Sequence, residues 1–204
     1  MGHEQKAGHN INPQIINQAI ISPDNDGHKA KLKVLTQPNI GLESDVRQLV
    51  IKILNTSLAD EAVLSQKTRS AYWNVRGTGF LELHILFETQ YQQLNEITDR
   101  IAERASMLGG IAIASFKEFL AHTHIEEETQ VVPDNLHLLA DHEKVIRFLR
   151  EDIRKCNEEY EDEGTVDLMI GVMSLHEKMA WMLRAYIENE TVKGESQKRK
   201  LNNE

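Results

Sequence analysis

Hydrophobic side chains begin to recur in a regular pattern at Leu42. From there they follow one another mostly at steps of three and four residues, which places them on one face of an α-helix. The members of this first set are Val46, Leu49, Val50, Ile53, Leu54, Leu58 and Leu64. The pattern predicts a helix over about residues 42–74, which the two glycines of RGTGF interrupt.

Two more segments with helical periodicity follow. One runs from about 80 to 108 and stops at Gly109–Gly110, a pair that tolerates the left-handed conformation of a helix C-cap. The next helix is predicted over roughly 134–160, with Pro133 suited to its first turn. The apolar face of this helix consists of Leu136, Leu139, Ile146, Leu149 and Ile153.

A last helix is predicted over about 165–190, with Thr165 as its N-cap. The second and third helices are separated by a long segment, in which SFKEFLAH is expected to form a short helix. No stretch shows strand alternation of useful length. Four long helices with one long crossover indicate an all-α fold, a ferritin-like four-helix bundle with a short helix in the crossover between helices two and three.

The ends of the chain differ from this central part. Residues 1–40 lack sustained periodicity and contain three of the four prolines, so we expect a flexible N-terminal arm. The bundle then occupies residues 41–190. The polar stretch 191–204 is predicted to be a disordered tail with a small excess of basic side chains.

Length and composition fit one soluble domain. The chain has 204 residues, enough for one well-buried core and short for two. No apolar run approaches the roughly 20 residues that span a bilayer, so no membrane association is expected. The N-terminus lacks the apolar core of a signal peptide, and the single cysteine, Cys156, fits a reducing cytoplasm. The formal net charge of −9 disfavours nucleic acid as a partner.

The predicted helix over 80–108 carries four potential metal ligands on one side. His84 precedes Glu88 by four residues, and Asp99 precedes Glu103 by four. At about 100° per residue all four fall on one stripe, but the first and last lie roughly 28 Å apart along the axis. A single metal ion cannot bridge that gap within one chain.

The two pairs share a centre, between positions 93 and 94. A second, antiparallel copy related by a two-fold axis at that point would set His84 against its Glu103, and Glu88 against its Asp99. Each of the two identical sites would then hold one imidazole and three carboxylates, which suits iron or manganese and is also accepted by zinc. Polar residues on a helix are also typical of a solvated face, and the spacing alone leaves that alternative open.

Residues 72–110 also resemble the signature of a known family. WNVRG, F-x-x-x-H, F-E-x-x-Y and D-x-x-A-E-R stand in register there, and a looser similarity extends over about 42–190, including HEKMAWMLRAYIE. The family is Dps, the mini-ferritins of starved bacterial cells. The resemblance implies a shell of twelve subunits held by two-fold and three-fold contacts, in the bacterial cytoplasm or nucleoid.

The resemblance also implies a ferroxidase activity that protects against oxidative stress. Fe(II) would be oxidised at the two-fold interfaces, preferably by hydrogen peroxide and otherwise by oxygen, and the ferric product stored as mineral inside the shell. The family's iron ligands correspond here to His84, Glu88, Asp99 and Glu103. Many members carry aspartate at the position of Glu88; glutamate keeps the charge with a longer reach.

One position departs from the family pattern. Tyr72 stands immediately before the tryptophan, where the family usually has an iron-binding histidine. A neutral phenol is a poor ligand at pH 7, because its unperturbed pKa is about 10. Tyr72 would therefore be a weak ligand or would hydrogen-bond a ligand water, and the site is altered in either case. His142 or His176 could replace the missing histidine ligand, although their spacing in the sequence does not indicate this role.

Two further segments carry charge that could serve iron entry or DNA binding. The acidic run NEEYEDEGTVD would surround the three-fold pores by the resemblance, making Asp167, Asp162 and Glu161 candidates for iron entry; the alternative is a solvated turn. Some Dps proteins bind DNA through lysine-rich tails. Of the two ends of this chain, the C-terminal KGESQKRK is the better candidate. We expect little DNA binding at physiological salt. The alternative to the ferroxidase is a nucleoid-binding structural shell with weakened or absent activity.

Overall fold

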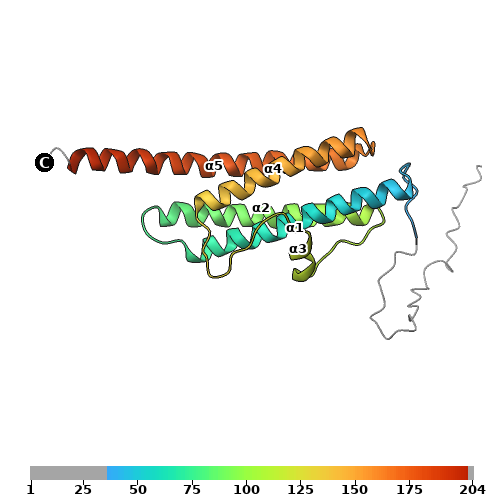
Figure 1. Cartoon of the computed structure of the whole chain (residues 1–204), viewed down its shortest axis with the longest axis horizontal. Coiled ribbons are helices and arrows are strands. Elements are labelled where there is room, and N and C mark those ends of the chain that lie inside the picture. Colours follow the sequence, from blue (N-terminus) through green and yellow to red (C-terminus); the bar gives the residue numbers. More distant parts are fainter. Residues whose placement is uncertain (1–35, 202–204) are drawn as a thin grey trace, which may run out of the picture. The chain divides into compact units, whose positions relative to one another are not determined.

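Two helical hairpins make up the bundle, as Figure 1 shows. In the first, α1 (Ser44–Asn74) is joined by a short turn to α2 (Phe80–Met107). In the second, α4 (Asn135–Glu158) turns directly into α5 (Glu163–Leu201). The computed structural model describes the backbone of residues 36–201 and the side chains of residues 36–189. Within these residues the fold is all-helical, which confirms the predicted fold class.

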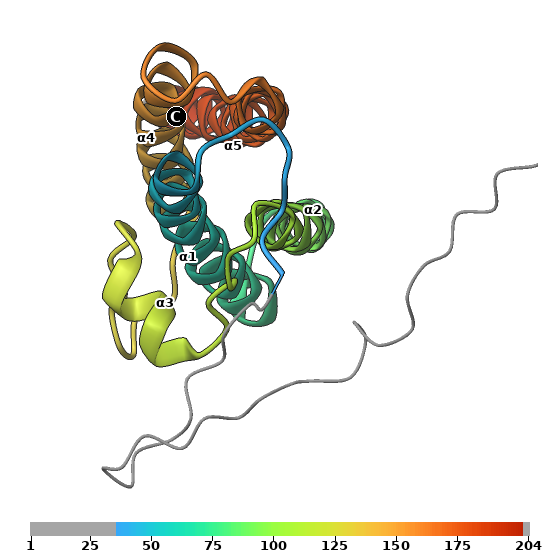
Figure 2. The same cartoon turned by 90° about the vertical axis from the view of Figure 1, so that its right-hand side faces the viewer.

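The four long helices surround one apolar core, seen end-on in Figure 2. All four contribute fully buried side chains, because each carries apolar residues at helical spacing. The largest of these are Phe87, Leu54, Leu58, Leu64, Leu94, Ile97, Ile101, Leu108, Leu138, Leu149, Met169 and Met179. The short helix α3 (Phe116–His122) lies outside this core, beside α1.

Local sequence signals explain where α2 and α3 end or begin. Gly109 adopts a positive φ of 81°, and its N–H donates to the carbonyl of Ser106. The N–H of Gly110 donates to the carbonyl of Ala105, which completes a Schellman motif and confirms the predicted stop. At the start of α3, Ser115 caps the helix through a capping box with Glu118.

The caps of α4 and α5 differ from the sequence prediction by a few residues. Pro133 lies before α4 and not in its first turn; Asp134 is the N-cap, since its carboxylate accepts hydrogen bonds from the backbone of Leu136 and His137. The predicted cap Thr165 lies inside α5, and its N–H donates to the carboxylate of Asp162. A carboxylate accepts more strongly from free helix N–H groups than a hydroxyl does, which favours aspartate at both positions.

The C-terminal end of α5 is a second difference. The sequence predicted a disordered tail over 191–204, whereas the helix continues to Leu201. This stretch contains one glycine and no proline, and adding turns to an existing helix avoids the unfavourable nucleation step. The predicted N-terminal arm over 1–40 falls largely outside the described residues. None of the described helices combines the length and hydropathy that a membrane crossing requires.

The crossover between the hairpins is fixed to α1. The Asp60 carboxylate, which is buried, accepts hydrogen bonds from the Thr123 hydroxyl and the His124 backbone, and it pairs with the His124 ring at 2.9 Å.

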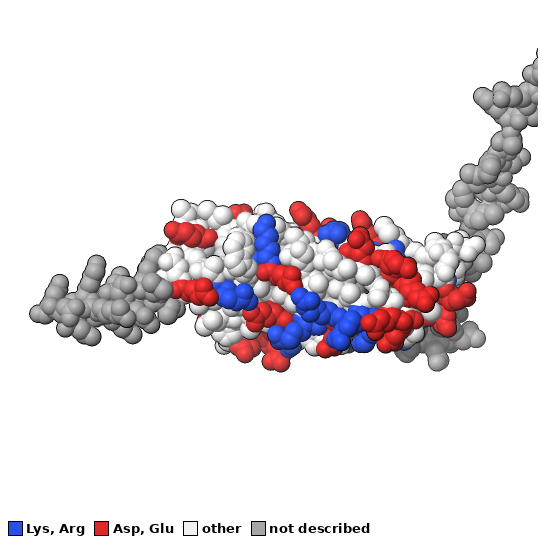
Figure 3. Space-filling view, turned by 90° about the horizontal axis from the view of Figure 1, so that it is seen from above, with Lys and Arg blue, Asp and Glu red and all other residues white. Residues whose placement is uncertain are grey.

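On the molecular surface acidic and basic side chains are interspersed on the face shown in Figure 3. This face therefore has no single-sign charge.

Candidate metal centre

His84 is held in one orientation by the backbone of α1. Its ring atom Nδ1 lies 3.1 Å from the carbonyl oxygen of Tyr72. A carbonyl can only accept a hydrogen bond, so Nδ1 carries the proton and the lone pair of Nε2 is free. A backbone contact of this kind commonly orients a metal-binding imidazole and fixes its tautomer.

Aromatic rings enclose the same imidazole. The Tyr72 ring stacks on His84 with centroids 4.0 Å apart, and Phe80 stacks on it at 5.2 Å. Tyr91 then meets Tyr72 edge-on at 5.3 Å, and the guanidinium of Arg69 lies 4.9 Å from the Tyr91 centroid. The imidazole is therefore held by stacking as well as by its hydrogen bond, which limits rotation of the ring.

Glu88 lies one helical turn beyond His84 and is half-buried. Burial raises the pKa of the Tyr72 phenol above its usual 10, and electrostatic interaction with Glu88 and Tyr91 raises it further. The phenol is therefore neutral at pH 7. In this arrangement Tyr72 packs against the imidazole, and it has to lose a strongly held proton before it can act as a ligand.

Asp99 and Glu103 lie further along α2 with exposed side chains. One chain brings Tyr72, His84 and Glu88 together but leaves these two carboxylates roughly 22 to 28 Å from His84 along the helix. Among the described residues, no three acidic, histidine or cysteine side chains of a single chain converge as a metal site requires. The predicted ligand set therefore needs a second chain.

The ligand stripe of α2 also carries exposed hydrophobic side chains. Leu81 is 62% exposed and Ile85 is 54% exposed, and both lie on the same side of the helix as Glu88. Phe80, which begins α2, is exposed as well. Clustered apolar side chains of this size are typical of a surface that a partner covers.

Comparison with known proteins decides the family. A model of the ferritin-like domain matches residues 51–191. A low temperature-induced protein of Nostoc sp. is 42% identical over 158 residues, which cover 76% of this chain and 88% of that protein. The DNA protection during starvation protein 2 of Bacillus anthracis is 34% identical over 141 residues, 68% of this chain and 96% of that protein. The chain belongs to the Dps family.

Solved Dps structures agree with this assignment. The Dps protein of Vibrio cholerae superposes with a TM-score of 0.70 at 30% identity, over 76% of this chain and 99% of that one. It is described as a member of a broad superfamily of ferritin-like diiron-carboxylate proteins. The family resemblance and the ferritin-like bundle predicted from the sequence are both confirmed.

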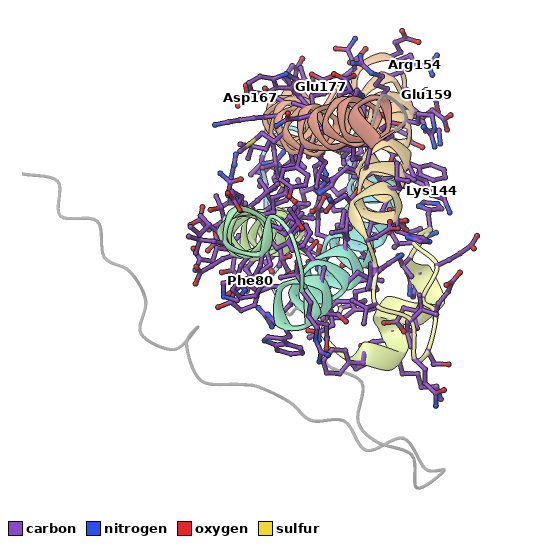
Figure 4. All side chains as sticks on the ribbon, turned by 90° about the vertical axis from the view of Figure 1, so that its left-hand side faces the viewer. Phe80, Lys144, Arg154, Glu159, Asp167 and Glu177 are labelled. Atoms are coloured by element: carbon purple, nitrogen blue, oxygen red, sulfur yellow. The ribbon has the colours of Figure 1, made fainter. Side chains whose placement is uncertain are left out.

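The three acidic pore candidates of this Dps protein have different environments. Asp167 is exposed on α5, at the position labelled in Figure 4, and Glu161 is exposed in the turn that precedes this helix. Asp162 is buried, where it accepts from the Thr165 hydroxyl at 2.6 Å and pairs with Arg104 at 2.6 Å. Asp162 thus caps α5 and links it to α2, so its carboxylate is already occupied.

The histidines considered as substitutes for the missing ligand lie elsewhere. His142 and His176 are both fully buried in the bundle core and hydrogen-bond to each other. Neither reaches the exposed stripe of α2, so within one chain they do not complete the site around His84.

The aromatic neighbours of His84 were only partly visible in the sequence. The motif F-E-x-x-Y includes Tyr91, three residues after Glu88, but its edge-on contact with Tyr72 depends on the packing of α1 against α2. Phe80 begins α2 one turn before His84, a spacing that signals contact on a helix. That spacing was the one available sign of the Phe80 stacking.

Proposed function

We propose that this Dps protein oxidises Fe(II) at sites shared by two chains and stores the ferric product inside a closed shell of twelve subunits. The orientation of His84 is the observation that carries the proposal. Its Nδ1 is bonded to a backbone carbonyl, which leaves the lone pair of Nε2 available to a metal ion. The Glu88 carboxylate lies one helical turn further along α2. An imidazole and a carboxylate on adjacent turns form half of a metal site.

The other half would come from Asp99 and Glu103 of a second copy. Within the described residues the carboxylates of Glu88, Asp99 and Glu103 have no hydrogen bond or ion pair, so each is available to a cation. Leu81 and Ile85 on the same stripe support a dimer, since burying them removes exposed apolar area from water. The arrangement suits iron, and manganese or zinc could occupy the same ligands.

The proposed reaction consumes iron as its substrate. Each Fe(II) gives up one electron, and the reduction of one hydrogen peroxide to two waters takes up two electrons and two protons. Two Fe(II) are therefore oxidised for each peroxide. Oxygen would be the alternative oxidant. The carboxylates stabilise the additional positive charge of Fe(III) relative to Fe(II), and the neutral Tyr72 keeps the imidazole in place.

Iron entry and storage follow from the proposed shell. Asp167 and Glu161, which are exposed near the beginning of α5, are proposed to line the three-fold pores. Acidic side chains there would raise the local concentration of divalent cations. We leave Asp162 out of this role because its carboxylate caps α5 and pairs with Arg104.

DNA protection, named in the B. anthracis relative, is the second candidate function. The net charge of −9 and the interspersed charges in Figure 3 weaken attraction to phosphate, and the basic segment 191–204 is the part of the sequence that favours it. A gel shift with the full chain and with a chain lacking 191–204 tests this. We expect any binding at low salt to be lost near physiological salt, because phosphate contacts release counterions.

The primary experiment measures size and iron oxidation together. Light scattering of the full-length protein should give a dodecamer, and anaerobic Fe(II) should be oxidised faster after addition of peroxide than in a protein-free control. A monomer at micromolar concentration, or oxidation no faster than in buffer, would contradict the proposal.

A further inference from the structure

A continuous chain of hydrogen bonds crosses the core of the bundle. Glu61 on α1 lies 2.9 Å from Nε2 of His176 on α5, and Nδ1 of His176 lies 2.9 Å from Nδ1 of His142 on α4. All three side chains are 0% exposed. Since α1 belongs to one hairpin and α4 and α5 to the other (Figure 2), the bond between Glu61 and His176 connects the two hairpins.

The distance between the two Nδ1 atoms limits how many protons the pair can hold. One nitrogen must donate and the other must accept, so a single proton lies between them. Two doubly protonated imidazoles would face each other with two N–H groups and no acceptor. Therefore at most one of His142 and His176 is cationic while the chain of hydrogen bonds is intact.

The His142 end of the chain has no acceptor for a further proton. Within the described part of the molecule, neither Nε2 of His142 nor Oε2 of Glu61 has a hydrogen-bond partner. A second proton on His142 would therefore be buried without an acceptor, which is strongly unfavourable in an apolar core. In agreement, burial lowers the pKa of His142 well below 6.5, and the charge of His176 lowers it further.

Among the described residues, the other buried acids are bonded elsewhere: Asp60 to Thr123 and His124, and Asp162 to Arg104. From α1 the chain receives only Glu61, and the buried side chains of α2 include no acid or base. Asp141, next to His142 on α4, is turned to Lys67 on α1, 2.5 Å away. On α5, His176 is the only titratable side chain that the described contacts bring to His142.

We propose that the Glu61–His176–His142 chain, which joins α1, α5 and α4, is acid-sensitive, and that its His142–His176 bond breaks when the histidine pair takes up a further proton. Above neutral pH the chain is intact and holds the three helices together. In acid the further proton on His142 has no acceptor in the core, so the two imidazoles are forced apart and α4 packs less stably against α5.

The direction of the pH effect follows from proton binding in the two states. The unfolded chain protonates His142 as the pH falls through about 6.5, whereas the folded chain does not until a lower pH. The unfolded state then binds more protons, so stability is present above about pH 6.5 and is lost as the pH falls below it. A difference of one bound proton between the unfolded and the folded state changes the unfolding equilibrium constant about tenfold per pH unit.

Urea unfolding of the full-length protein between about pH 7.5 and 5.5 tests the link, at one protein concentration because assembly shifts apparent stability. His142→Gln replaces the imidazole with a neutral amide. His122→Gln is the control, since His122 is exposed on α3 and its ring bonds a backbone carbonyl of the same helix. We expect the urea-unfolding equilibrium of His142→Gln to lose the pH dependence of about one bound proton, up to tenfold per pH unit, and His122→Gln to keep the slope of the wild type.

Equal pH slopes for folded wild type and His142→Gln would overturn the proposal. If His142→Gln does not fold, exchange of the histidine C2 hydrogen in the wild type, followed by mass spectrometry, gives the titration of each histidine in the intact assembly. His142 should stay neutral well below pH 6.5. Ordinary titration of His142 would likewise overturn the proposal.

Discussion

Histidine serves two different purposes on the two sides of these helices. On the outer stripe of α2, His84 gives one nitrogen to a backbone carbonyl and keeps the other free beside a carboxylate. In the core, His142 and His176 bond to each other, and His176 also bonds to Glu61. The free nitrogen of His84 is on a partly exposed side chain, whereas the free nitrogen of His142 is sealed from solvent.

The difference shows what prepares an imidazole to bind metal. Both environments fix the imidazole ring, but only that of His84 leaves a lone pair that a cation can reach. In the proposed site, two carboxylates of a second chain would bind the same cation. The inner one uses the nitrogens to connect helices, and burial makes an added charge unfavourable. Substitutions on the outer stripe should therefore affect assembly and iron chemistry, and substitutions in the core should affect stability.

The largest effect is expected from a charge placed in the proposed dimer contact. Ile85→Glu would bury a carboxylate without a partner, at a cost of several kcal/mol per ion, so the shell should fall apart into smaller species. Gln48→Glu adds the same charge at an exposed position of α1 and serves as the control. Light scattering distinguishes them, and an intact dodecamer of Ile85→Glu would place the contact elsewhere.

Removing the outer imidazole should have the next largest effect. His84→Gln takes away the neutral donor while the stacking space stays filled, and losing a metal-site contact typically lowers affinity or activity about 10- to 100-fold. The initial rate of Fe(II) oxidation measures it. The exposed His137→Gln should oxidise iron as the wild type does, and an equal rate for His84→Gln would exclude this residue as a ligand.

A smaller gain is expected at Tyr72. In Tyr72→His an imidazole, available as a neutral donor near pH 7, replaces a phenol whose pKa is raised by burial and by Glu88. Fe(II) affinity or the initial rate should rise, on the order of tenfold at most. Tyr72→Phe, which keeps the ring without the hydroxyl, is the control. No gain in Tyr72→His would indicate that this position lies outside the metal's reach.

The core histidine should matter least for iron chemistry. His142→Gln, compared at neutral pH and at equal concentrations of folded shell, should oxidise Fe(II) at the wild-type rate, because His142 is buried away from the stripe of α2. A large loss of rate in a fully assembled His142→Gln shell would show that core and stripe are coupled.

Much of the fold was predictable because the hydrophobic spacing is regular. The helix limits were correct to within a few residues except at the end of α5, which runs to Leu201, and Gly109 stops α2 as expected. The caps Asp134 and Asp162 were missed, since several neighbouring residues can cap a helix and only the backbone geometry decides between them.

The candidate site was predictable in part. The positions of His84 and Glu88 on one face follow from helical spacing alone. The stacking of Tyr72 on His84 and the contact between His142 and His176 join residues far apart in the chain. Such contacts depend on which helices pack together and at what register, and no local pattern encodes that.

The most direct measurement asks whether two defective chains can repair one another. With His84→Ala in one chain and Glu103→Ala in its mate, one shared site loses both ligands and the other keeps all of them. Mixed dimers, verified by mass spectrometry, should therefore oxidise Fe(II) although neither parent does, and the recovered activity should stand well above background. Verified mixed dimers without recovered activity would contradict a site shared between two chains.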